Sequence, residues 1–407
     1  MAERYPGGVI SKTPPTVTPP NSSGPLAGEG GSASGMWTLD TVLEYEKAGA
    51  WPKPVLPREL YAWGSNNNGQ IGDGTVVDRS SPVQIGALTN WVQVAAGNAH
   101  TASVKTDGTM WTWGSNAFGQ LGDGTVVDRS SPVQIGALTN WSQVSAGANH
   151  AASVKTDGTM WVWGRNTNGR LGDGTIVNRS SPVQLGALTN WVQVSAGGSH
   201  TASVKTDGTM WTWGLNNRGQ LGDGTVIQRS SPVQVGALTN WSQVSAGFYH
   251  TASIKTDGTM WTWGLNSDGR LGDGTVVNRS SPVQIGALTN WSQVSAGGSH
   301  TASVKTDGTL WTWGDNTLGQ LGSGTVVARS SPVQVGALTN WSQVAAGIYH
   351  TASIKTDGTM WSWGTNGSGQ LGDGTVVYRS SPVQIGALTN WSQVAASFDH
   401  TAAITKG

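Results

Sequence analysis

The chain has 407 residues, enough to bury a large core, and it carries 23 basic and 23 acidic side chains. A formal net charge of zero, with only 11% charged residues, argues against a nucleic-acid-binding stripe. The absence of Cys excludes disulfides and thiolate chemistry. No apolar run approaches the roughly 18 residues of a membrane span, and the first ten residues lack the order of a signal peptide.

The first segment of the chain is rich in Pro, Gly, Ser and Thr and cannot bury enough apolar surface to fold alone. We therefore expect an extended arm over residues 1–36. Residues 37–49 (WTLDTVLEYEKAG) predict one short helix, and a Pro-rich lead-in completes a second segment, residues 37–59. The apolar side of this helix, which would dock the arm, consists of Trp37, Leu39, Val42 and Leu43.

From residue 60 onward, a unit of 50 residues recurs seven times without insertion. One copy contains four short segments rich in β-branched and aromatic residues, which predict strands. These strands are expected at residues 141–146, 150–155, 159–163 and 181–185. Asp157-Gly158 predicts a tight hairpin between the second and third strands. Four antiparallel strands per unit, repeated seven times, predict an all-β, seven-bladed propeller over residues 60–407.

The two ends of the repeat region predict how the ring closes. The region begins with a third strand, at residues 60–63, and ends after a second strand, at residues 400–404. We therefore expect the strands within 391–405 to pair with the strands within 60–85. One blade would then be built from both ends of the chain, which leaves no open sheet edge.

The motifs AGxxHT, DGTxWxWGxNxxGQLG and SSPVQ resemble the propeller repeat of the regulator-of-chromosome-condensation family over residues 60–407. The resemblance implies a possible guanine-nucleotide exchange role on a small GTPase, but every loop here has a fixed length and none inserts a wedge. A plant photoreceptor of the family uses Trp and Arg at the two positions before the repeat His, and this chain has neither there. The arm is similar to a segment of tailed-phage structural proteins, from PGG-x-ISKTPPT to EYEKAGAWP.

Three sets of positions vary among the seven copies: the pair before each His, the residues around the Asn after each Trp-Gly, and the residue before each Arg-Ser-Ser. Alternate loops of an antiparallel meander lie on one side, so we expect all three sets on one face of the ring. All three Phe of the chain fall there, which favours a recognition surface over neutral drift. The predicted partner-binding residues are Phe118, Arg165, Leu215, Arg218, Phe248, Tyr249, Leu265, Asp268, Asp315, Leu318, Ile348, Tyr349, Tyr378, Phe398 and Asp399.

The residues that every copy repeats are interpreted as structural. We expect the regular Trp residues to form the core between blades and the seven His to be buried and hydrogen-bonded, too far apart to share a metal ion. The Asp of each LGDGT motif should cap its turn, and Arg129 and its equivalents should bridge neighbouring blades. No phosphate loop, nucleophile elbow or paired carboxylates occur, so we expect no enzyme activity, no metal and no cofactor.

Together these features lead to the prediction of a non-enzymatic phage virion structural protein, similar to a tail fibre or adhesin. Its varied face would bind a host surface glycan, a host protein or another virion protein. The arm would dock into the particle in several copies, which places the chain on the virion surface. Two alternatives stay open: a capsid decoration or spacer protein, and a cellular regulator acting on a small GTPase.

Overall fold

The computed structural model of the chain describes residues 4–5, 8–9 and 58–406, and the chain divides into two compact units. In the first unit, β1 (Arg4–Tyr5) pairs antiparallel with β2 (Gly8–Val9). The helix predicted at 37–49, with its docking side chains Trp37, Leu39, Val42 and Leu43, lies outside the described residues. Nothing in the described part forms a helix long and apolar enough to cross a membrane.

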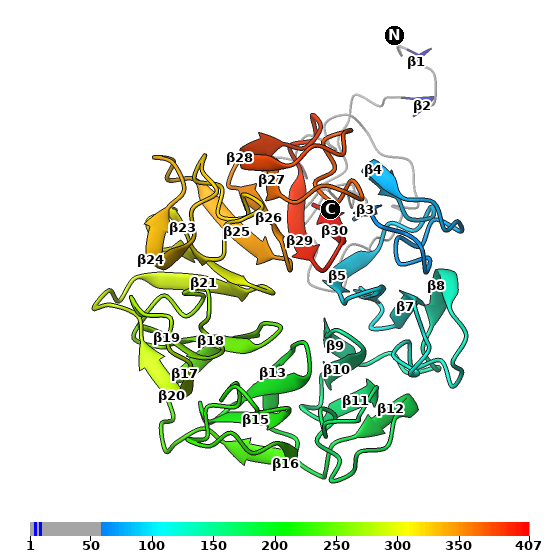
Figure 1. The fold of residues 1–407 in the computed structure, drawn as a ribbon. Coiled ribbons are helices and arrows are strands. Elements are labelled where there is room, and N and C mark those ends of the chain that lie inside the picture. The colour runs from blue at the N-terminus through cyan, green and yellow to red at the C-terminus, as the bar shows by residue number, and fades with distance from the viewer. Residues whose placement is uncertain (1–3, 6–7, 10–57, 407) are drawn as a thin grey trace, which may run out of the picture. The chain divides into compact units, whose positions relative to one another are not determined.

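The second unit, Arg58–Lys406, is a closed ring of seven four-stranded antiparallel sheets, as predicted (Figure 1). The innermost strands are β5 (Trp91–Ala96), β9 (Trp141–Ala146), β13 (Trp191–Ala196), β17 (Trp241–Ala246), β21 (Trp291–Ala296), β25 (Trp341–Ala346) and β29 (Trp391–Ala396). The second strands are β6 (His100–Lys105), β10 (His150–Lys155), β14 (His200–Lys205), β18 (His250–Lys255), β22 (His300–Lys305), β26 (His350–Lys355) and β30 (His400–Thr405). The third strands are β7 (Met110–Gly114), β11 (Met160–Gly164), β15 (Met210–Gly214), β19 (Met260–Gly264), β23 (Leu310–Gly314), β27 (Met360–Gly364) and β3 (Leu60–Gly64). The outermost strands are β8 (Arg129–Gln134), β12 (Arg179–Gln184), β16 (Arg229–Gln234), β20 (Arg279–Gln284), β24 (Arg329–Gln334), β28 (Arg379–Gln384) and β4 (Arg79–Gln84).

The closing blade contains strands from both ends of the repeat region, in the order β29-β30-β3-β4. Leu60 pairs with Ile404 and Gly64 pairs with His400, which confirms the predicted closure. The first two strands of each blade have the predicted bounds. The third and fourth differ by one or two residues, because a register shift after Val162 in the copy with β11 brings Gly164 opposite Arg179.

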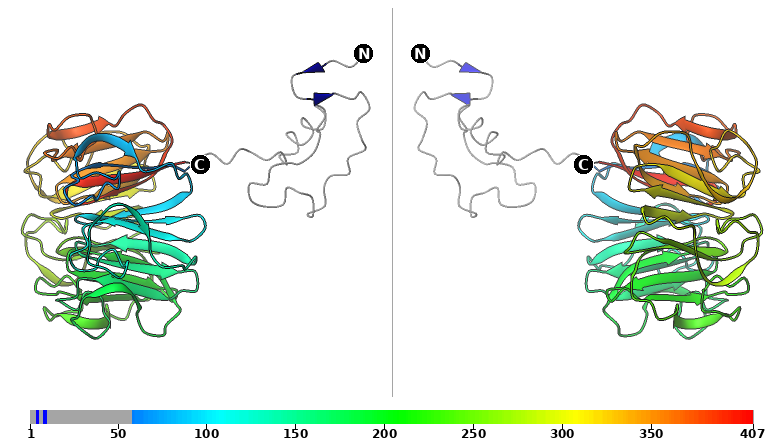
Figure 2. Two further views of the ribbon diagram at one scale, coloured as in Figure 1. Left: turned by 90° about the vertical axis from the view of Figure 1, so that its right-hand side faces the viewer. Right: turned by 90° about the vertical axis from the view of Figure 1, so that its left-hand side faces the viewer.

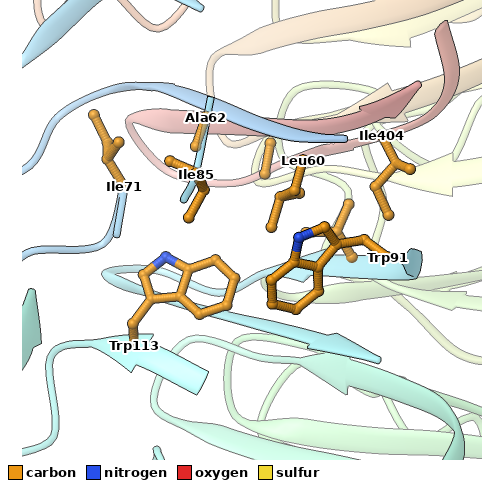
Figure 3. Packing of buried hydrophobic residues seen from close by; sticks show 9 residues of the cluster. Leu60, Ala62, Ile71, Ile85, Trp91, Trp113 and Ile404 are labelled. Atoms are coloured by element: carbon orange, nitrogen blue, oxygen red, sulfur yellow. The ribbon is translucent and has the colours of Figure 1, made fainter. Parts of the chain in front are cut away.

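Tryptophan rings and aliphatic side chains fill the layer between neighbouring blades. At the closing blade, Leu60, Ile85 and Ile404 pack against Trp91 and Trp113 of the next blade (Figure 3). The Trp113 ring is fully buried, and its Nε1 donates a hydrogen bond of 2.9 Å to the carbonyl oxygen of Gln70. Large rings bury much apolar area at each contact, so this layer, repeated seven times, stabilises the ring. The predicted Trp core between blades is confirmed.

Each repeat His is fully buried and lies between two blades. His200 Nε2 lies 2.8 Å from Thr251 Oγ1 of the next blade, and that hydroxyl donates to the carbonyl oxygen of Gln220. The hydroxyl proton is already used, so the imidazole N–H donates to Thr251. The same contact recurs at every His except His100, which meets Ala151 where other copies have Thr. The predicted structural His is therefore confirmed.

A belt of glutamine side chains joins the innermost strands around the axis. Gln93 Oε1 accepts a hydrogen bond of 2.7 Å from the backbone N–H of Val144 in the next blade. The last member of the belt, Gln393 in β29, accepts from Val94 in β5 at 2.9 Å, so the belt closes on itself. Buried side chains that hydrogen-bond to backbone across blades fix the register of one blade against the next.

Candidate functional site

The loops between the first and second strands, and those between the third and fourth, open on one face of the ring. We call this the loop face and define it by the 1–2 loops (97–99 and its equivalents) and the 3–4 loops (115–128 and its equivalents). In each blade the two loops touch: the backbone N–H of Ser115 donates to the carbonyl oxygen of Ala99 at 2.7 Å. The edge-on views in Figure 2 show strands of the ring running between its two faces. All three variable sets therefore lie on one face, as the meander predicted.

A buried asparagine holds each 3–4 loop from inside. Asn116 has no exposed surface; its Nδ2 donates to Asp123 Oδ1 and to the carbonyl oxygens of Thr125 and Val127, while its Oδ1 accepts from the N–H of Leu121. The sequence shows this Asn in all seven copies, and we did not predict its role. Because buried groups hold the loop shape, the remaining side chains of the loop are free to differ.

The aspartate of each LGDGT motif caps its turn and also pairs with arginine. Asp123 Oδ1 accepts from the backbone N–H and the hydroxyl of Thr125, which confirms the predicted cap. Burial raises the pKa of Asp123, but the hydrogen bonds from Thr125 and Arg129 outweigh burial and leave the pKa below its ordinary value. Arg129 lies 2.9 Å from Asp123 in its own blade. The prediction that this Arg bridges neighbouring blades is wrong, because the loop folds back over six residues and places the carboxylate beside the guanidinium.

The variable residue before each Arg-Ser-Ser is partly explained by the same loop. Asp128 accepts a hydrogen bond of 2.7 Å from the backbone N–H of Asn116, and Asn178 does the same for Asn166 at 2.8 Å. A side-chain cap of this kind requires a short polar residue. Tyr378 cannot supply it, and its ring is instead 51% exposed on the loop face.

The seven 1–2 loops surround the mouth of the central channel, where they line a cavity of about 100 Å³. The first residue of each variable pair faces this cavity: Asn98, Ala148, Gly198, Phe248, Gly298, Ile348 and Phe398. Backbone hydrogen bonds tie neighbouring loops together, for example from Phe248 N–H to the carbonyl oxygen of Gly297 at 3.1 Å and from Ile348 N–H to that of Ser397 at 2.9 Å. The mouth is therefore a rigid frame that carries large apolar side chains on only part of its circumference.

Large and small residues at the mouth are coupled across blades. A Cβ placed on Gly198 would come within 3 Å of the Phe248 ring, and one on Gly298 would come within 2.5 Å of the Ile348 side chain. The Phe248 and Tyr249 rings contact edge to face with centroids 4.8 Å apart, and the Tyr349 and Phe398 rings do so at 6.2 Å. Glycine in one copy thus makes room for a large side chain in the next.

The charged residues of the predicted site divide into free and paired groups. Arg218 is exposed, and the Arg165 guanidinium lies 4.7 Å from the centre of the Phe118 ring. Asp268 pairs with Arg270, and Asp315 accepts from Gln320 Nε2 at 2.9 Å. The paired carboxylates are therefore less available to a partner than the sequence suggested.

Asp399 follows Phe398 in the last 1–2 loop but does not line the mouth itself. Burial, with the neighbouring charge of Asp78, raises the pKa of Asp399 to about 6, and its Oδ1 accepts from Gln370 Nε2 at 3.1 Å.

Two buried arginines at the mouth were not predicted. Arg170 and Arg270 replace the Gln of other copies, are at most 5% exposed, and donate to the carbonyl oxygens of Gly198 and Gly298. The signal was present in the sequence, since both Arg positions precede a copy whose variable pair is Gly-Ser. These hydrogen bonds hold the 1–2 loops that contain glycine instead of a large side chain.

Leu215 and Leu265 lie where the two loop types meet, whereas Leu318 lies within its 3–4 loop and its backbone N–H donates to Gln320 Oε1. Leu215, Leu265 and Leu318 are half-buried, and the backbone N–H of Leu265 donates to the carbonyl oxygen of Tyr249 at 3.0 Å. All fifteen predicted residues thus lie on the loop face, but only Phe248, Ile348 and Phe398 line the mouth itself. That these residues contact a partner stays a prediction.

The loop face also carries a pair of exposed apolar residues in every copy, and comparison of the copies does not single these residues out because they hardly vary. Each 3–4 loop ends in two β-branched residues that are 55–61% exposed. They are Val76, Val77, Val126, Val127, Ile176, Val177, Val226, Ile227, Val276, Val277, Val326, Val327, Val376 and Val377. Within the described residues, no group of three or more His, Cys, Asp or Glu side chains is arranged to hold a metal ion.

The fold places the described unit in the class of closed seven-bladed propellers built from repeats, with a partly apolar mouth on its loop face. The RCC1-like domain family matches residues 59–403, and the chain belongs to that family. Its fold is similar to human WBSCR16, with a TM-score of 0.78 and 21% identity over 86% of this chain and 99% of the other. Yeast RCC1 (Prp20) bound to Kap60 is also similar, with a TM-score of 0.77 and 20% identity over 86% of this chain and 89% of the other.

A further similar structure is Prp20p from Saccharomyces cerevisiae, described with its binding properties to Gsp1p and histones. Its TM-score is 0.75, at 20% identity over 86% of this chain and 92% of the other. The prediction of a phage virion adhesin is wrong as the main function, because the matching family and these structures favour the alternative of an RCC1-like regulator. The partners predicted with it, a host surface and other virion proteins, find no support, and neither does the resemblance of the arm to phage proteins.

Proposed function

We propose that this chain is a protein-binding regulator of the RCC1-like family whose loop face engages a small GTPase. The observation that carries the proposal is the mouth of the central channel. There, Phe248, Ile348 and Phe398 converge from three different blades, with Tyr249 37% exposed beside them. Apolar and aromatic side chains held on a rigid frame and ringed by polar groups are typical of the centre of a protein interface.

The composition of the loop face suits a folded protein partner better than a small molecule. The cavity of about 100 Å³ is smaller than the roughly 300 Å³ or more of a drug-sized ligand site. Exposed Tyr378, Arg218 and the paired β-branched residues extend the contact area from the mouth to the outer part of the 3–4 loops. A partner could therefore cover the mouth and reach the surrounding loops together.

Two considerations favour a GTPase as the first partner to test. The family resemblance implies this role, and the similar protein Prp20p was characterised for binding to Gsp1p. No loop of this ring is longer than its copies, so binding would depend on the side chains at the mouth rather than on an inserted wedge. We propose no catalytic group: the chain would favour one nucleotide state of its partner by binding that state more tightly.

The test is a nucleotide-release assay on a panel of small GTPases loaded with a fluorescent GDP analogue, together with binding to each GTPase. We expect the full chain to bind one member of the panel and accelerate release. Replacing Phe248, Ile348 and Phe398 together with Ser should lower the affinity at least tenfold. The matched control replaces Leu138, Leu188 and Leu238 with Ser; these are 46–49% exposed in the connectors of the opposite face. Equal binding by the two triple variants, or no binding by the full chain, would contradict the proposal.

A further inference from the structure

A second feature lies away from the loop face, in the grooves between neighbouring blades on the outer wall. One groove of about 530 Å³ lies between β12 and β16 and is lined by Leu185, Leu188, Trp191, Trp211 and Pro232, with Lys205 among them. An equivalent groove of about 510 Å³ contains Lys355, and a smaller one of about 280 Å³ lies beside Trp141 and Trp161. These grooves recur because the residues that line them are copied with the repeat.

Lysines line two of these grooves, Lys205 in one and Lys355 in the other, and within residues 58–406 neither forms an ion pair with a carboxylate. Lys205 is 6% exposed, and its Nζ lies 4.6 Å from the Trp191 ring centre and 4.0 Å from that of Trp211. Within residues 58–406, no hydrogen bond or ion pair of Lys205 Nζ accompanies these contacts. An ammonium has three donors, and contacts with two ring faces leave it without an oxygen acceptor from the protein. Burial lowers the pKa of Lys205, an effect that the charge of Asp207 opposes.

The surroundings of the ammonium are apolar and open on one side. Leu188 is 49% exposed at one end of the groove; Val183 of the preceding blade lines one side, and Pro232 of the blade that contains Lys205 lines the other. The neighbouring Arg179 is already paired with Asp173 at 2.8 Å. A ligand that fits this groove must bring an anionic acceptor to Lys205 and apolar groups to the walls.

We propose that these grooves bind acidic peptide segments of a partner, each with a Glu or Asp carboxylate on the lysine ammonium and apolar neighbours on the groove walls. A charge-assisted hydrogen bond is stronger than a neutral one, and the apolar side chains of the bound peptide would exclude water from it. The lysine and its two rings occur in six copies, at Lys105, Lys155, Lys205, Lys255, Lys305 and Lys355. Six weak sites on one wall would suit a partner with several acidic segments.

The closing blade has a carboxylate and no lysine in the corresponding region, so we expect it not to bind the acidic peptide. There, Thr405 replaces the lysine, Tyr61 replaces a tryptophan, and the Tyr61 hydroxyl donates to Glu59 Oε2 at 2.8 Å. The closing blade therefore has a carboxylate beside Tyr61 and no lysine, so we expect it to repel an acidic peptide. The ring therefore contains its own negative control.

The experiment titrates the full chain with acetyl-Leu-Glu-Leu-amide and with the matched Gln peptide, while ¹³C-labelled lysine Cε signals are followed by NMR. We expect the Glu peptide to shift the signals of the six groove lysines and to bind at least tenfold more tightly than the Gln peptide. Lys205→Met should remove the response of one groove, whereas Lys406→Met, which removes an exposed charge outside the grooves, should change nothing. If Lys205→Met does not fold, Lys205→Arg tests the same groove with its charge retained.

Equal affinity for the two peptides, or lysine signals that do not move, would overturn the proposal. The outcome is independent of the GTPase assay, because the peptide sites and the mouth share no residues. A chain could fail one test and pass the other.

Discussion

The loop face and the opposite face of the ring are built by the same seven repeats, yet only one of them varies. On the opposite face, each KTDGT turn is packed under the connector of its own blade: a Cβ on Gly158 would collide with the carbonyl oxygen of Thr189, and Trp191 N–H donates to the carbonyl oxygen of Gly158 at 3.1 Å. On the loop face, buried Asn116 and backbone hydrogen bonds hold the loops. Sequence variation is tolerated where buried side chains and backbone hydrogen bonds hold the loop, and it is excluded where close backbone packing leaves no room for a side chain.

Acidification should destabilise the layer between blades, which the two faces share, through its buried His residues. Burial, with the charge of Arg170, lowers the pKa of His200 from 6.5 to about 3, and burial lowers that of His100 to about 4. Because the unfolded chain binds these protons first, stability is complete above pH 6.5 and is lost as the pH falls toward 3. Denaturant midpoints measured from pH 7 to pH 4.5 should fall steadily. Midpoints that stay constant over that range would contradict the buried, neutral His layer.

The loop face should show the opposite pH response at one residue. The folded pKa of Asp399 is about 6 against an ordinary 3.8, so its ionisation costs stability as the pH rises between these values. Asp399→Asn should therefore be more stable than the natural chain at pH 7, and the gain should vanish below about pH 4. The same denaturant series measures it, with Asp128→Asn as a control whose side chain still accepts from Asn116 N–H.

A substitution in a turn of the opposite face should cost more than one in the connector. Gly158 has φ +76° with backbone close to its Cβ position, whereas Gly186 has φ +62° with nothing within 4 Å. Gly158→Ala should lose about 2–4 kcal/mol from strain and overpacking, and Gly186→Ala about 1–2 kcal/mol from strain alone. Calorimetry or denaturant unfolding measures both. Equal losses would show that packing does not distinguish the two positions.

The coupling at the mouth can be broken and restored on the loop face itself. Gly298→Ala should destabilise by roughly 1–3 kcal/mol, because its Cβ meets Ile348. The double variant Gly298→Ala with Ile348→Gly recreates the natural pair Ala148 and Gly198, and it should recover most of that loss. A double-mutant cycle measures the coupling. Additive effects would mean that the two loops are independent.

The smallest expected effect is a gain within the copied scaffold. His100 meets Ala151, and neither of its ring nitrogens has a hydrogen-bond partner among the described residues. Ala151→Thr should restore the bond that six other copies make and stabilise the fold by about 1 kcal/mol. Thr201→Ala is the matched control and should lose at least as much, since it leaves His150 unpaired. Thermal unfolding measures both variants.

Much of the fold could be predicted because the repeat copies its hydrophobic pattern without interruption. The strands, the closure of Leu60 on Ile404 and the structural His all follow from spacing and alternation. The ion pair of Arg129 was assigned to the wrong neighbour, because loop curvature and not sequence distance decides which carboxylate it meets. The buried Asn116 could have been found from its presence in every copy, and Arg170 from the Gly-Ser pair of the copy that follows it, although most arginines are exposed.

By itself, the sequence determined the ring, its closure and the positions that are free to vary. Each 50-residue repeat forms one blade, and a blade can bury its apolar faces only against neighbouring copies of itself. Only the tertiary structure decided which of the variable residues lie close to one another. Phe248, Ile348 and Phe398 are 50 to 150 residues apart in the chain, and they surround one mouth because the closed ring brings its 1–2 loops to a single axis. The tertiary structure also decided that Lys205 lies against two tryptophans and that no carboxylate within residues 58–406 pairs with it, because the fold of its own blade completes that environment.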